Sequence, residues 1–359
     1  MFSLQPLFNR QPEPMIGLDI SASSIKLVEL GKNKVGQYVL ERCAIQPLER
    51  GWIVDGSIEK FDEVAEAIRR LVAKSGTRAK NVAMALPPSA VISKKIVLPG
   101  GLSDTELEMH VEAEASQYIP FPLEEVSLDF CVMGSGTSAE GDVDVLIAAS
   151  RREKVSDIQG LAEVAGLKPV IVDVESFAAR AAAQRLIETM PDQGLGSIVA
   201  LFEMGALSSS MQVLLDDDVL YERDQAFGGG QLTQMIARQY GFSLEEAEYK
   251  KRNAELPEDY AEAVLQPFID NIVQEIGRAL QFFFTSTPYH NVDGILLAGG
   301  TAALPGLTET VTRSTTFACS VVNPFEDMEI GPNVQVHRMM REAPSYLTAC
   351  GLAMRRFRP

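Results

Sequence analysis

The sequence predicts an α/β protein made of two related halves. Strand-like apolar runs alternate with segments whose apolar residues recur every three or four positions, as in amphipathic helices. A strand that ends in a carboxylate and small residues occurs twice, at Asp19 and at Glu203, 184 positions apart in a chain of 359 residues. A block over residues 89–168 has its own strands and helices, which indicates an inserted subdomain.

The first half begins with strands joined by short turns. Apolar residues at 58, 61, 64, 65, 68, 71 and 72 have helical spacing, so we expect a helix over Ser57–Ser75. Pro87 and Pro88 close the last strand of this stretch, because proline has no N–H for a sheet. The expected strands are Met15–Ile20, Ile25–Leu30, Tyr38–Ile45 and Asn81–Leu86.

The pattern over residues 89–168 predicts the order β-α-β-β-α. Ser103 and Glu106 have the spacing of a capping box, so a helix begins at Ser103 and ends near Tyr118, before Pro120. The turn-rich sequence GSGTSAEGD separates two of the strands. The other expected elements are strands at Ala90–Leu98, Val126–Met133 and Val143–Ser150 and a helix at Lys154–Ala165.

The second half follows a strand at Val170–Val174 and an alanine-rich helix at Glu175–Thr189. The loop over 191–196 marks a change in composition, and three consecutive strands then lead into Gly228-Gly229-Gly230. The expected elements are strands at Ser197–Glu203, Ser208–Leu215, Asp218–Arg223 and Gly294–Ala298, and helices at Gln231–Tyr240, Leu244–Asn253, Ala261–Thr285, Leu304–Ser314 and Tyr346–Arg356.

The composition excludes several classes of protein. The net charge of −17 argues against a general nucleic-acid binder and against broad electrostatic docking on anionic lipid. The four cysteines are far apart and form no C-x-x-C pair, so we expect reduced thiols and neither a disulfide scaffold nor a zinc site. Since the start has no apolar signal region and no 18-residue apolar run occurs, we expect a soluble cytoplasmic protein that inserts nothing into a membrane.

The repeated hairpins have the residues of a phosphate clamp. In each, a carboxylate (Asp19 or Glu203) precedes small hydroxyl residues, and a tight turn of small residues lets N–H and hydroxyl groups approach phosphate oxygens. A carboxylate at the strand end can hold the hydrated magnesium that accompanies those phosphates. Either hairpin alone is equally well explained as an ordinary turn, so the prediction depends on the repetition.

Three other segments extend this pattern. Lys26, in the strand after Asp19, is either a phosphate ligand or a surface lysine. Gly299-Gly300-Thr301 follows a buried strand, where glycine lets a flat ring or ribose lie against the backbone, although an ordinary turn has the same sequence. The helices near 175–189 and 346–356 are rich in small residues, which suits a close contact at a hinge or plain core packing.

In order and spacing, these motifs resemble those of the actin-like ATPase superfamily, which implies a two-domain, ribonuclease H-like fold with duplicated sheets. The segments MIGLDISASSIKLVEL, VDVESFA, FGGG, AEYKKR and LLAGGTAALPGL are most similar to the PilM family of type IV pilus assembly proteins, relatives of the division protein FtsA. The implied division is a flexible arm at 1–14, subdomain 1A at 15–88 and 169–190, an inserted FtsA-type subdomain 1C at 89–168, subdomain 2A at 191–230 and 286–359, and a helical subdomain 2B at 231–285.

The resemblance also implies a site for ATP and magnesium between the halves, with the magnesium held through water by Asp19 and Glu203. Glu248 and Lys251 are three residues apart, on one helix face, and would contact the ribose or purine. The other implied contacts are Asp19, Ser21, Ser23, Ser24 and Lys26 in the first phosphate loop, Gly205 and Ser208 in the second, Gly229 and Gly230 beside phosphate or ribose, and Gly299, Gly300 and Thr301 at the adenosine.

The phosphate loops depart from the family pattern at three places. Glu203 stands where the second loop normally opens with Asp, Ala206-Leu207 replaces glycine or a polar residue, and Ser21 replaces a glycine. Hydrolysis requires an attacking water placed to within a fraction of an ångström. We therefore expect nucleotide binding with weak or absent hydrolysis, and Glu175 is the candidate that would position the water.

The family resemblance implies a cytoplasmic scaffold of the type IV pilus inner-membrane platform that supports pilus biogenesis and twitching motility. It would bind the N-terminal cytoplasmic tail of PilN in a groove between subdomains 1A and 1C, so that a protein partner brings it to the membrane. Nucleotide would set the hinge angle and the shape of partner surfaces. The resemblance also implies contacts with other platform and motor proteins and self-association.

Two other functions on the same fold stay open. An active ATPase or small-molecule kinase would need a catalytic carboxylate in the cleft and would release phosphate steadily. An FtsA-like division protein would polymerise and bind membrane through an amphipathic helix. The final segment MRRFRP, with three arginines and Phe357, lacks the apolar face that an interfacial helix needs.

Overall fold

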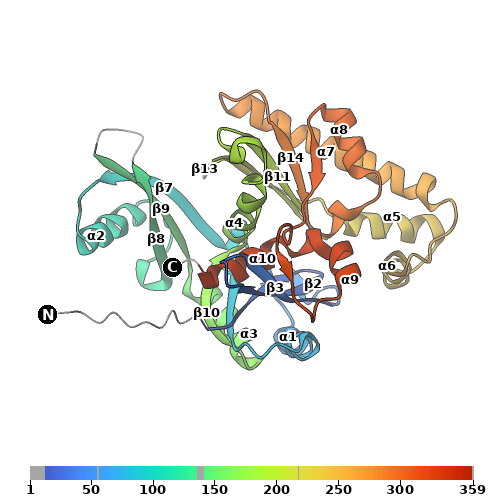
Figure 1. The fold of residues 1–359 in the computed structure, drawn as a ribbon, viewed down its shortest axis with the longest axis horizontal. Helices are drawn as coiled ribbons and strands as arrows, with labels where there is room; N and C mark the ends of the chain where they lie inside the picture. The colour runs from blue at the N-terminus through green and yellow to red at the C-terminus, as the bar shows by residue number, and fades with distance from the viewer. Residues whose placement is uncertain (1–12, 55, 136–140, 217, 358–359) are drawn as a thin grey trace.

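The computed structural model describes residues 13–54, 56–135, 141–216 and 218–357. Most of the predicted arm, residues 1–12, and the terminal pair 358–359 lie outside the described residues. Two α/β lobes pack against each other, and a smaller lobe containing α2 and β7–β9 projects to one side (Figure 1). Among the described residues, no helix is both long enough and apolar enough to cross a membrane.

The first lobe is built on a six-stranded sheet. Its first three strands are antiparallel neighbours, and two crossover strands then run parallel to the first strand. A short strand from far along the chain pairs with the opposite edge. In spatial order the strands are β10 (Lys168–Val174), β6 (Asn81–Leu86), β1 (Met15–Ser21), β2 (Ser24–Lys32), β3 (Tyr38–Pro47) and β16 (Glu329–Ile330).

The second lobe repeats this arrangement in a five-stranded sheet. Its first three strands are again antiparallel, and its last two again run parallel to the first. In spatial order the strands are β13 (Asp218–Gln225), β12 (Ser209–Leu215), β11 (Ile198–Met204), β14 (Gly294–Ala298) and β15 (Cys319–Val321). Because both sheets have the order third, second, first, fourth, fifth, the predicted duplication of the sheet is confirmed.

Helices cover both faces of each sheet. One core contains β1, β2 and β6 with α1 and α3, and another contains β11 and β12 with α7 and α8. Between the two sheets, α4 and α10 form a third core with residues of both halves. The helices are α1 (Phe61–Ser75), α2 (Asp104–Ala115), α3 (Arg152–Val164), α4 (Glu175–Ile187), α5 (Gly230–Tyr240), α6 (Leu244–Asn253), α7 (Gln266–Ser286), α8 (Leu307–Thr315), α9 (Val336–Glu342) and α10 (Leu347–Met354).

The smaller lobe has a three-stranded antiparallel sheet in the order β7 (Val91–Pro99), β9 (Asp142–Arg151) and β8 (Val126–Ser135). Helix α2 covers one face of this sheet, and its capping box at Ser103 and Glu106 is present. Helix α3 instead packs in the core of the first lobe. Residues 152–168 therefore share a core with the segments predicted as subdomain 1A, although the sequence placed them in the insert.

Lys95 links the smaller lobe to the second lobe. Its Nζ lies 2.8 Å from Asp144 Oδ2 on the neighbouring strand and 3.3 Å from Asp218 Oδ1 at the start of β13. The hydrogen bond to Asp144 is the largest cause that raises the pKa of Lys95, and the bond to Asp218 adds to it. Burial acts in the opposite direction but is outweighed. The ammonium group therefore stays charged between two carboxylates from different lobes.

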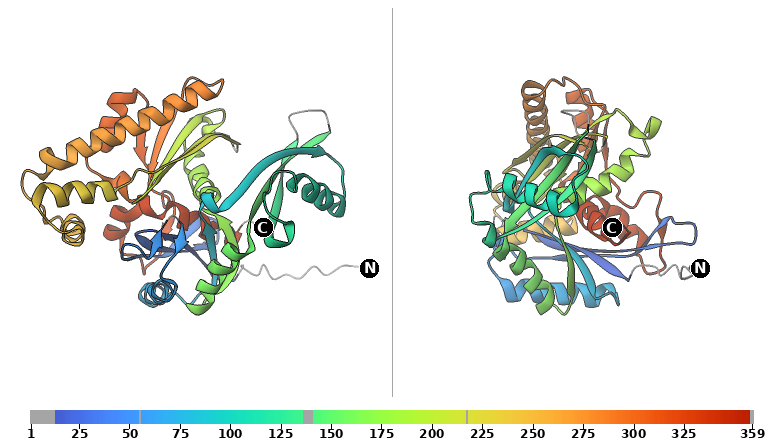
Figure 2. Two further views of the ribbon diagram at one scale, coloured as in Figure 1. Left: turned by 180° about the vertical axis from the view of Figure 1, so that it is seen from behind. Right: turned by 90° about the vertical axis from the view of Figure 1, so that its left-hand side faces the viewer.

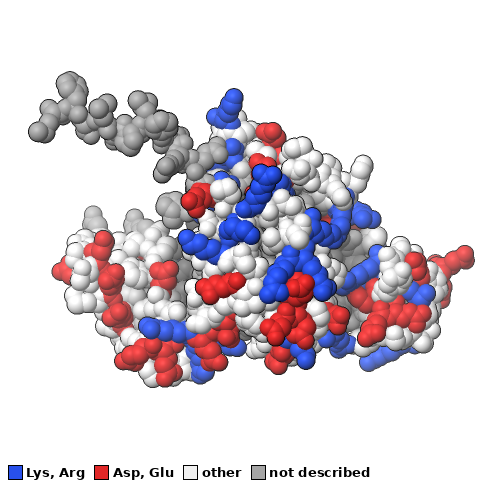
Figure 3. All heavy atoms as spheres, turned by 90° about the horizontal axis from the view of Figure 1, so that it is seen from below, with Lys and Arg blue, Asp and Glu red and all other residues white. Residues whose placement is uncertain are grey.

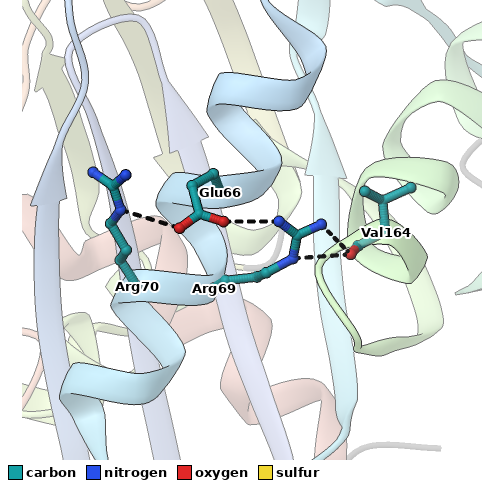
Figure 4. Close-up of polar contacts among 4 residues, drawn as sticks. All are labelled: Glu66, Arg69, Arg70 and Val164. Carbon is teal, nitrogen blue, oxygen red and sulfur yellow. Dashed lines mark hydrogen bonds and ion pairs between the residues drawn. The ribbon is translucent and has the colours of Figure 1, made fainter.

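Arg69 joins α1 to the end of α3. Figure 4 shows its guanidinium between Glu66 and the carbonyl of Val164, with Nε and Nη2 donating to that oxygen at 3.2 and 2.9 Å. This carbonyl is at the C-terminal end of α3, where helix carbonyls lack partners and cations are favoured. Glu66 accepts hydrogen bonds from both Arg69 and Arg70. These bonds lower the pKa of Glu66, and the bond from Arg69 has the larger effect.

The surface charge is uneven. Seen from below, Lys and Arg side chains gather over the middle of the face although the net charge is −17 (Figure 3). The exposed cations near the N-terminal ends of β6 and β10 include Arg78, Lys80 and Lys168. The overall acidity of the chain therefore does not extend to every face.

Two glycines allow α10 to touch the backbone of both neighbouring elements. A Cβ on Gly351 would lie 1.8 Å from the carbonyl oxygen of Ala178 in α4. A Cβ on Gly17 in β1 would lie 2.2 Å from the carbonyl oxygen of Ala349 in α10. Since both obstacles are backbone atoms, no side-chain rotation could make room, and the two helices and the strand meet only because these positions lack a side chain.

The structure differs from the expected elements at several places. Residues 57 and 58 form β5 (Ser57–Ile58), paired with β4 (Ile53–Val54), so α1 begins at Phe61 and not at Ser57. The long helix expected from Ala261 starts with a π-helical turn, because Pro267 lacks the N–H of a regular α-helix. The elements α9, β15 and β16 were not predicted, since these short segments show no periodicity.

Gly351→Ala tests the close approach of α10 and α4. We expect the substitution to lower the free energy of unfolding by about 3 kcal/mol or more, at the high end of overpacking costs, because backbone must move. Thermal unfolding followed by circular dichroism measures it. Gly277→Ala in α7 is the matched control: its Cβ would meet nothing within 4 Å, so a gain of about 0.5–1 kcal/mol is expected. An unchanged melting temperature for Gly351→Ala would contradict this account.

Candidate functional site

The first hairpin joins β1 to β2 and buries a carboxylate beside a lysine. Asp19 is only 6% exposed and lies opposite Lys26 in the strand register. The Nζ of Lys26 is 2.8 Å from Asp19 Oδ2 and donates to Ser21 Oγ at 2.9 Å, and Ser21 Oγ donates to the carbonyl of Ser24 at 3.0 Å. Lys26 is therefore a largely buried, paired lysine and not a surface residue.

The second hairpin joins β11 to β12 and places Glu203 against α10. Thr348 Oγ1 donates to Glu203 Oε1 at 2.8 Å. Burial and the negative charge of Asp19 raise the pKa of Glu203 to about 7, although the Thr348 hydrogen bond and Lys26 act in the opposite direction. Glu203 thus exchanges its proton near neutral pH, and it feels the charge of a residue from the other half.

Glu175, the first residue of α4, is the third carboxylate at this junction. Its pKa is raised well above the usual range by burial and then by the charges of Asp19 and Glu203. Partial desolvation also raises the pKa values of Glu222 and Asp224 on β13, although both residues are still exposed. The junction therefore concentrates negative charge from both halves around one buried lysine, and such a site favours a cation or a proton.

The glycine segments pack against the second hairpin. Gly299 has a φ of 86°, and a Cβ there would lie 2.3 Å from the carbonyl oxygen of Met204. Thr301 Oγ1 donates to the carbonyl of Gly205 at 3.1 Å. The N–H groups of Gly229 and Gly230 donate to the carbonyls of residues 205 and 206 at 3.0 and 2.8 Å. Glycine at these positions thus allows backbone to approach backbone, and the amides of Gly229 and Gly230 already have acceptors.

Glu248 and Lys251 form an ion pair on α6. Lys251 Nζ lies 2.6 Å from Glu248 Oε2, and Arg252 Nε lies 2.7 Å from Glu248 Oε1. Burial alone would raise the pKa of Glu248. The charges and hydrogen bonds of its partners, of which Lys251 has the largest effect, instead lower this pKa to about 2. The Glu248 carboxylate is therefore ionised at neutral pH.

The structure brings most predicted site residues into two connected groups. In the first group, the charges of Asp19 and Lys26 act on Glu175 and Glu203. In the second group, Gly205, Gly229 and Thr301 contact one another at the second hairpin. Gly300 lies beside Thr301, and the carbonyl of Ser23 accepts from the N–H of Leu48 at 2.9 Å, away from these groups. Ser208 is exposed at the turn, and its carbonyl accepts from the N–H of Gly205 at 3.0 Å.

Sequence reasoning missed Thr348 and Thr233. Thr348 is the only hydroxyl residue of α10, a helix that is otherwise apolar, and this isolated polar position was the available signal. Thr233 bonds both Glu248 and Lys251 but comes from a different helix. Its position three residues beyond the glycine run gave no indication of that contact.

The carboxylates suit magnesium held through water better than direct coordination. Oxygen ligands are what Mg²⁺ prefers, and it usually keeps several waters. Within the described parts of the chain, no group of three or more His, Cys, Asp or Glu side chains could hold a metal ion by itself. Asp19 and Glu203 would therefore contribute charge and hydrogen bonds to bound waters, a role that stays a prediction.

Comparison with known proteins identifies the family. The sequence model for the family described as type IV pilus assembly protein PilM matches residues 17–357. The chain belongs to the PilM family. A solved structure of a PilM–PilN type IV pilus biogenesis complex contains a chain that is 30% identical, with 96% of this chain and 99% of that chain covered and a TM-score of 0.79.

More distant structures share the fold of this PilM family member. The ethanolamine utilization protein EutJ of Carboxydothermus hydrogenoformans is 16% identical, with coverage of 96% of this chain and 90% of its own and a TM-score of 0.58. The nucleotide-free diol dehydratase-reactivating factor is 11% identical, with coverage of 96% and 99% and a TM-score of 0.53. The predicted PilM resemblance and the actin-like α/β fold with duplicated sheets are therefore confirmed.

Glu203→Gln tests the charge at the junction of the halves. The carboxyl of Glu203 has a pKa of about 7 in the folded protein against a usual value of 4.5. The stabilisation by its protonated form is complete below pH 4.5 and is lost as pH rises through 7. Glutamine does not titrate, so we expect the melting temperature of the variant to rise relative to the original chain across this range.

Melting curves over a pH series measure this difference. The exposed Glu245 on α6 provides the control Glu245→Gln, which removes one carboxyl away from the junction. A constant difference between Glu203→Gln and the original chain from pH 4.5 to above 7 would show that Glu203 ionises as freely as a solvated carboxyl.

Proposed function

We propose that this protein is a scaffold of the type IV pilus assembly platform that binds the N-terminal peptide of PilN and a nucleotide. The observation that carries the proposal is the 30% identity, over nearly the full length of both chains, to a chain of the PilM–PilN complex. Nucleotide and peptide would occupy different places, the first between the two large lobes and the second beside the small lobe.

The nucleotide proposal is supported by the arrangement of the two hairpins. After burial, the charge of Asp19 is the largest cause that raises the pKa of Glu203, so the carboxylate of the first hairpin lies near that of the second. Bound magnesium would offset the negative charge that now raises the pKa values of Glu175 and Glu203. ATP with Mg²⁺ supplies that cation together with the phosphates that Lys26 and the serines of the first hairpin could bind.

We expect the nucleotide to act as a conformational ligand and its hydrolysis to be slow. Glu175 is protonated over more of the pH range than an ordinary carboxyl, since its pKa is strongly raised, and a protonated carboxyl cannot take a proton from water. Ala206-Leu207 adds no polar group to the second loop. Steady release of phosphate at about 10 s⁻¹, the median for enzymes, would instead indicate an ATPase.

The face of the small sheet opposite α2 is the proposed place for the peptide. Ile96, Leu98 and Val145 pack on the α2 side. Lys95 and Leu146 are register partners that point to the opposite face. In Figures 1 and 2, α2 is the outermost element of this lobe, so the opposite face turns toward the body of the protein. An extended apolar peptide could lie between this face and the first lobe.

The same proposal implies where in the cell the protein acts. Binding to the cytoplasmic tail of PilN would hold it at the cytoplasmic side of the inner membrane without any segment of its own in the lipid. Contacts with further platform and motor proteins would then form around this attachment, and support of pilus biogenesis and twitching motility would follow from it.

Leu146→Asp tests the peptide face. A charge on this face would have to be desolvated when an apolar peptide docks, so we expect at least tenfold weaker binding of a synthetic N-terminal PilN peptide, about 1.4 kcal/mol. Isothermal titration calorimetry, with and without ATP and Mg²⁺, measures the affinity. Met109→Asp is the matched control, since Met109 is 59% exposed on the outer helix α2.

The peptide experiment separates three outcomes. Loss of binding in Leu146→Asp but not in Met109→Asp supports this face as the groove. Equal binding by both variants would place the peptide elsewhere. No binding by the original chain, with or without nucleotide, would overturn the PilN part of the proposal.

Asp19→Ala tests the nucleotide part. Removing this carboxylate takes away the partner of Lys26 and the charge nearest the first phosphate loop. We expect the affinity for ATP with Mg²⁺ to fall by about tenfold or more, measured by calorimetry. Asp157→Ala on the exposed face of α3 controls for loss of charge, and melting curves confirm that both variants fold. Unchanged affinity would mean that the phosphates bind elsewhere.

A further inference from the structure

Thr233 is a buried hydroxyl residue that joins two helices of the second lobe. It lies in the first turn of α5 and is only 7% exposed. Its Oγ1 donates to Glu248 Oε2 at 2.6 Å and accepts from Lys251 Nζ at 2.7 Å. Because Lys251 Nζ is also 2.6 Å from the same carboxylate oxygen, the three groups close a triangle.

The triangle uses the Thr233 hydroxyl as a donor and as an acceptor. A hydroxyl group has one proton to donate and lone pairs to accept, whereas an ammonium only donates and a carboxylate only accepts. Thr233 therefore stands between the two ions and bonds both at once. Hydrogen bonds with a charged partner are about twice as strong as those between neutral groups.

The charged ends of the pair are still accessible. The side chains of Lys251 and Glu248 are 23% and 33% exposed, so each keeps a surface that a ligand can reach. The ammonium group of Lys251 sits on a flexible chain of four carbons, and without a fixed partner such a side chain samples many rotamers. Fixing it in advance removes part of the entropy that a ligand would otherwise have to overcome.

Thr233 also connects the pair to the second hairpin. Gly229, one turn before Thr233, donates its N–H to the carbonyl of Gly205, and a Cβ on Gly229 would lie 2.6 Å from Thr301 Oγ1. The N–H of Thr233 in turn donates to the carbonyl of Gly229 at 3.4 Å. One turn of α5 therefore contacts the hairpin at one end and holds the α6 ion pair at the other.

We propose that Thr233 is a positioning residue for nucleotide binding, which fixes Lys251 and Glu248 in the orientation in which they contact the ribose or purine. This inference rests on the proposed nucleotide function, since that function assigns Glu248 and Lys251 to the ligand. Thr233 acts through the ion pair and does not touch the nucleotide itself. It fixes the distance between the residues that bind the base end and the loop that binds the phosphates.

Thr233→Val and Thr233→Ser test the role of the hydroxyl. Valine has the same shape without the donor and acceptor, so we expect the affinity for ATP with Mg²⁺ to fall by about tenfold, as for a lost hydrogen bond to a charged group. Serine keeps both functions and should stay within about threefold of the original chain. Calorimetry on the full chain gives the affinities, and melting curves show whether each variant folds.

A double-mutant cycle with Lys251→Met shows whether Thr233 acts through the ion pair. If it does, Thr233→Val causes no further loss of affinity in the Lys251→Met background, because the residue that it positions is gone. Thr310→Val is the matched control. Thr310 lies on α8, and its hydroxyl donates to the carbonyl of Gly306, which precedes that helix. That variant should bind nucleotide as the original chain does.

The outcomes separate this inference from the proposed function. Weak binding by Thr233→Val, rescue by Thr233→Ser and no additivity with Lys251→Met together support it. If the original chain binds ATP and Thr233→Val binds within twofold, or serine does not rescue, or the losses add, only the positioning role is overturned. If the original chain binds no nucleotide, the proposed nucleotide function fails and the positioning role fails with it.

Discussion

The contact of α10 with β1 and α4 is the constraint on which the rest of the structure depends. Gly17 and Gly351 remove the side chains that would hold these backbones apart, so residues from the start, middle and end of the chain share one core. Because α10 also carries Thr348, the same packing fixes Glu203. The electrostatics of the junction thus follow from two positions where only hydrogen fits.

The charges at this junction explain how a ligand could move the lobes. Asp19 comes from the first sheet and Glu203 from the second. The charge of Asp19 disfavours the ionised form of Glu203, and both charges disfavour the ionised form of Glu175. A cation or proton that enters between them removes a repulsion between the two halves. In the proposed function, ligand binding and the relative position of the lobes would be linked through this charge, and such a linkage acts in both directions.

Much of the fold could be predicted from the sequence, because repeated strand patterns and the hairpins at Asp19 and Glu203 are local signals. The duplicated sheet order follows from them. The role of α3 could not be predicted, since its sequence continues the insert while its apolar face belongs to the first core. The contacts of Thr233 and Thr348 could not be predicted either, because their partners lie 15 and 145 residues away.

The position of α10 in the chain has a consequence for biosynthesis. The first sheet is complete in sequence, apart from the short strand β16, once β10 ends at Val174, yet one of its faces packs against residues 347–354. A ribosome must therefore deliver nearly the whole chain before that face is covered. Contacts of such long sequence separation slow folding and leave apolar surface exposed in the meantime. The protein is expected to need protection from aggregation while it is being made, more than its net charge of −17 would suggest.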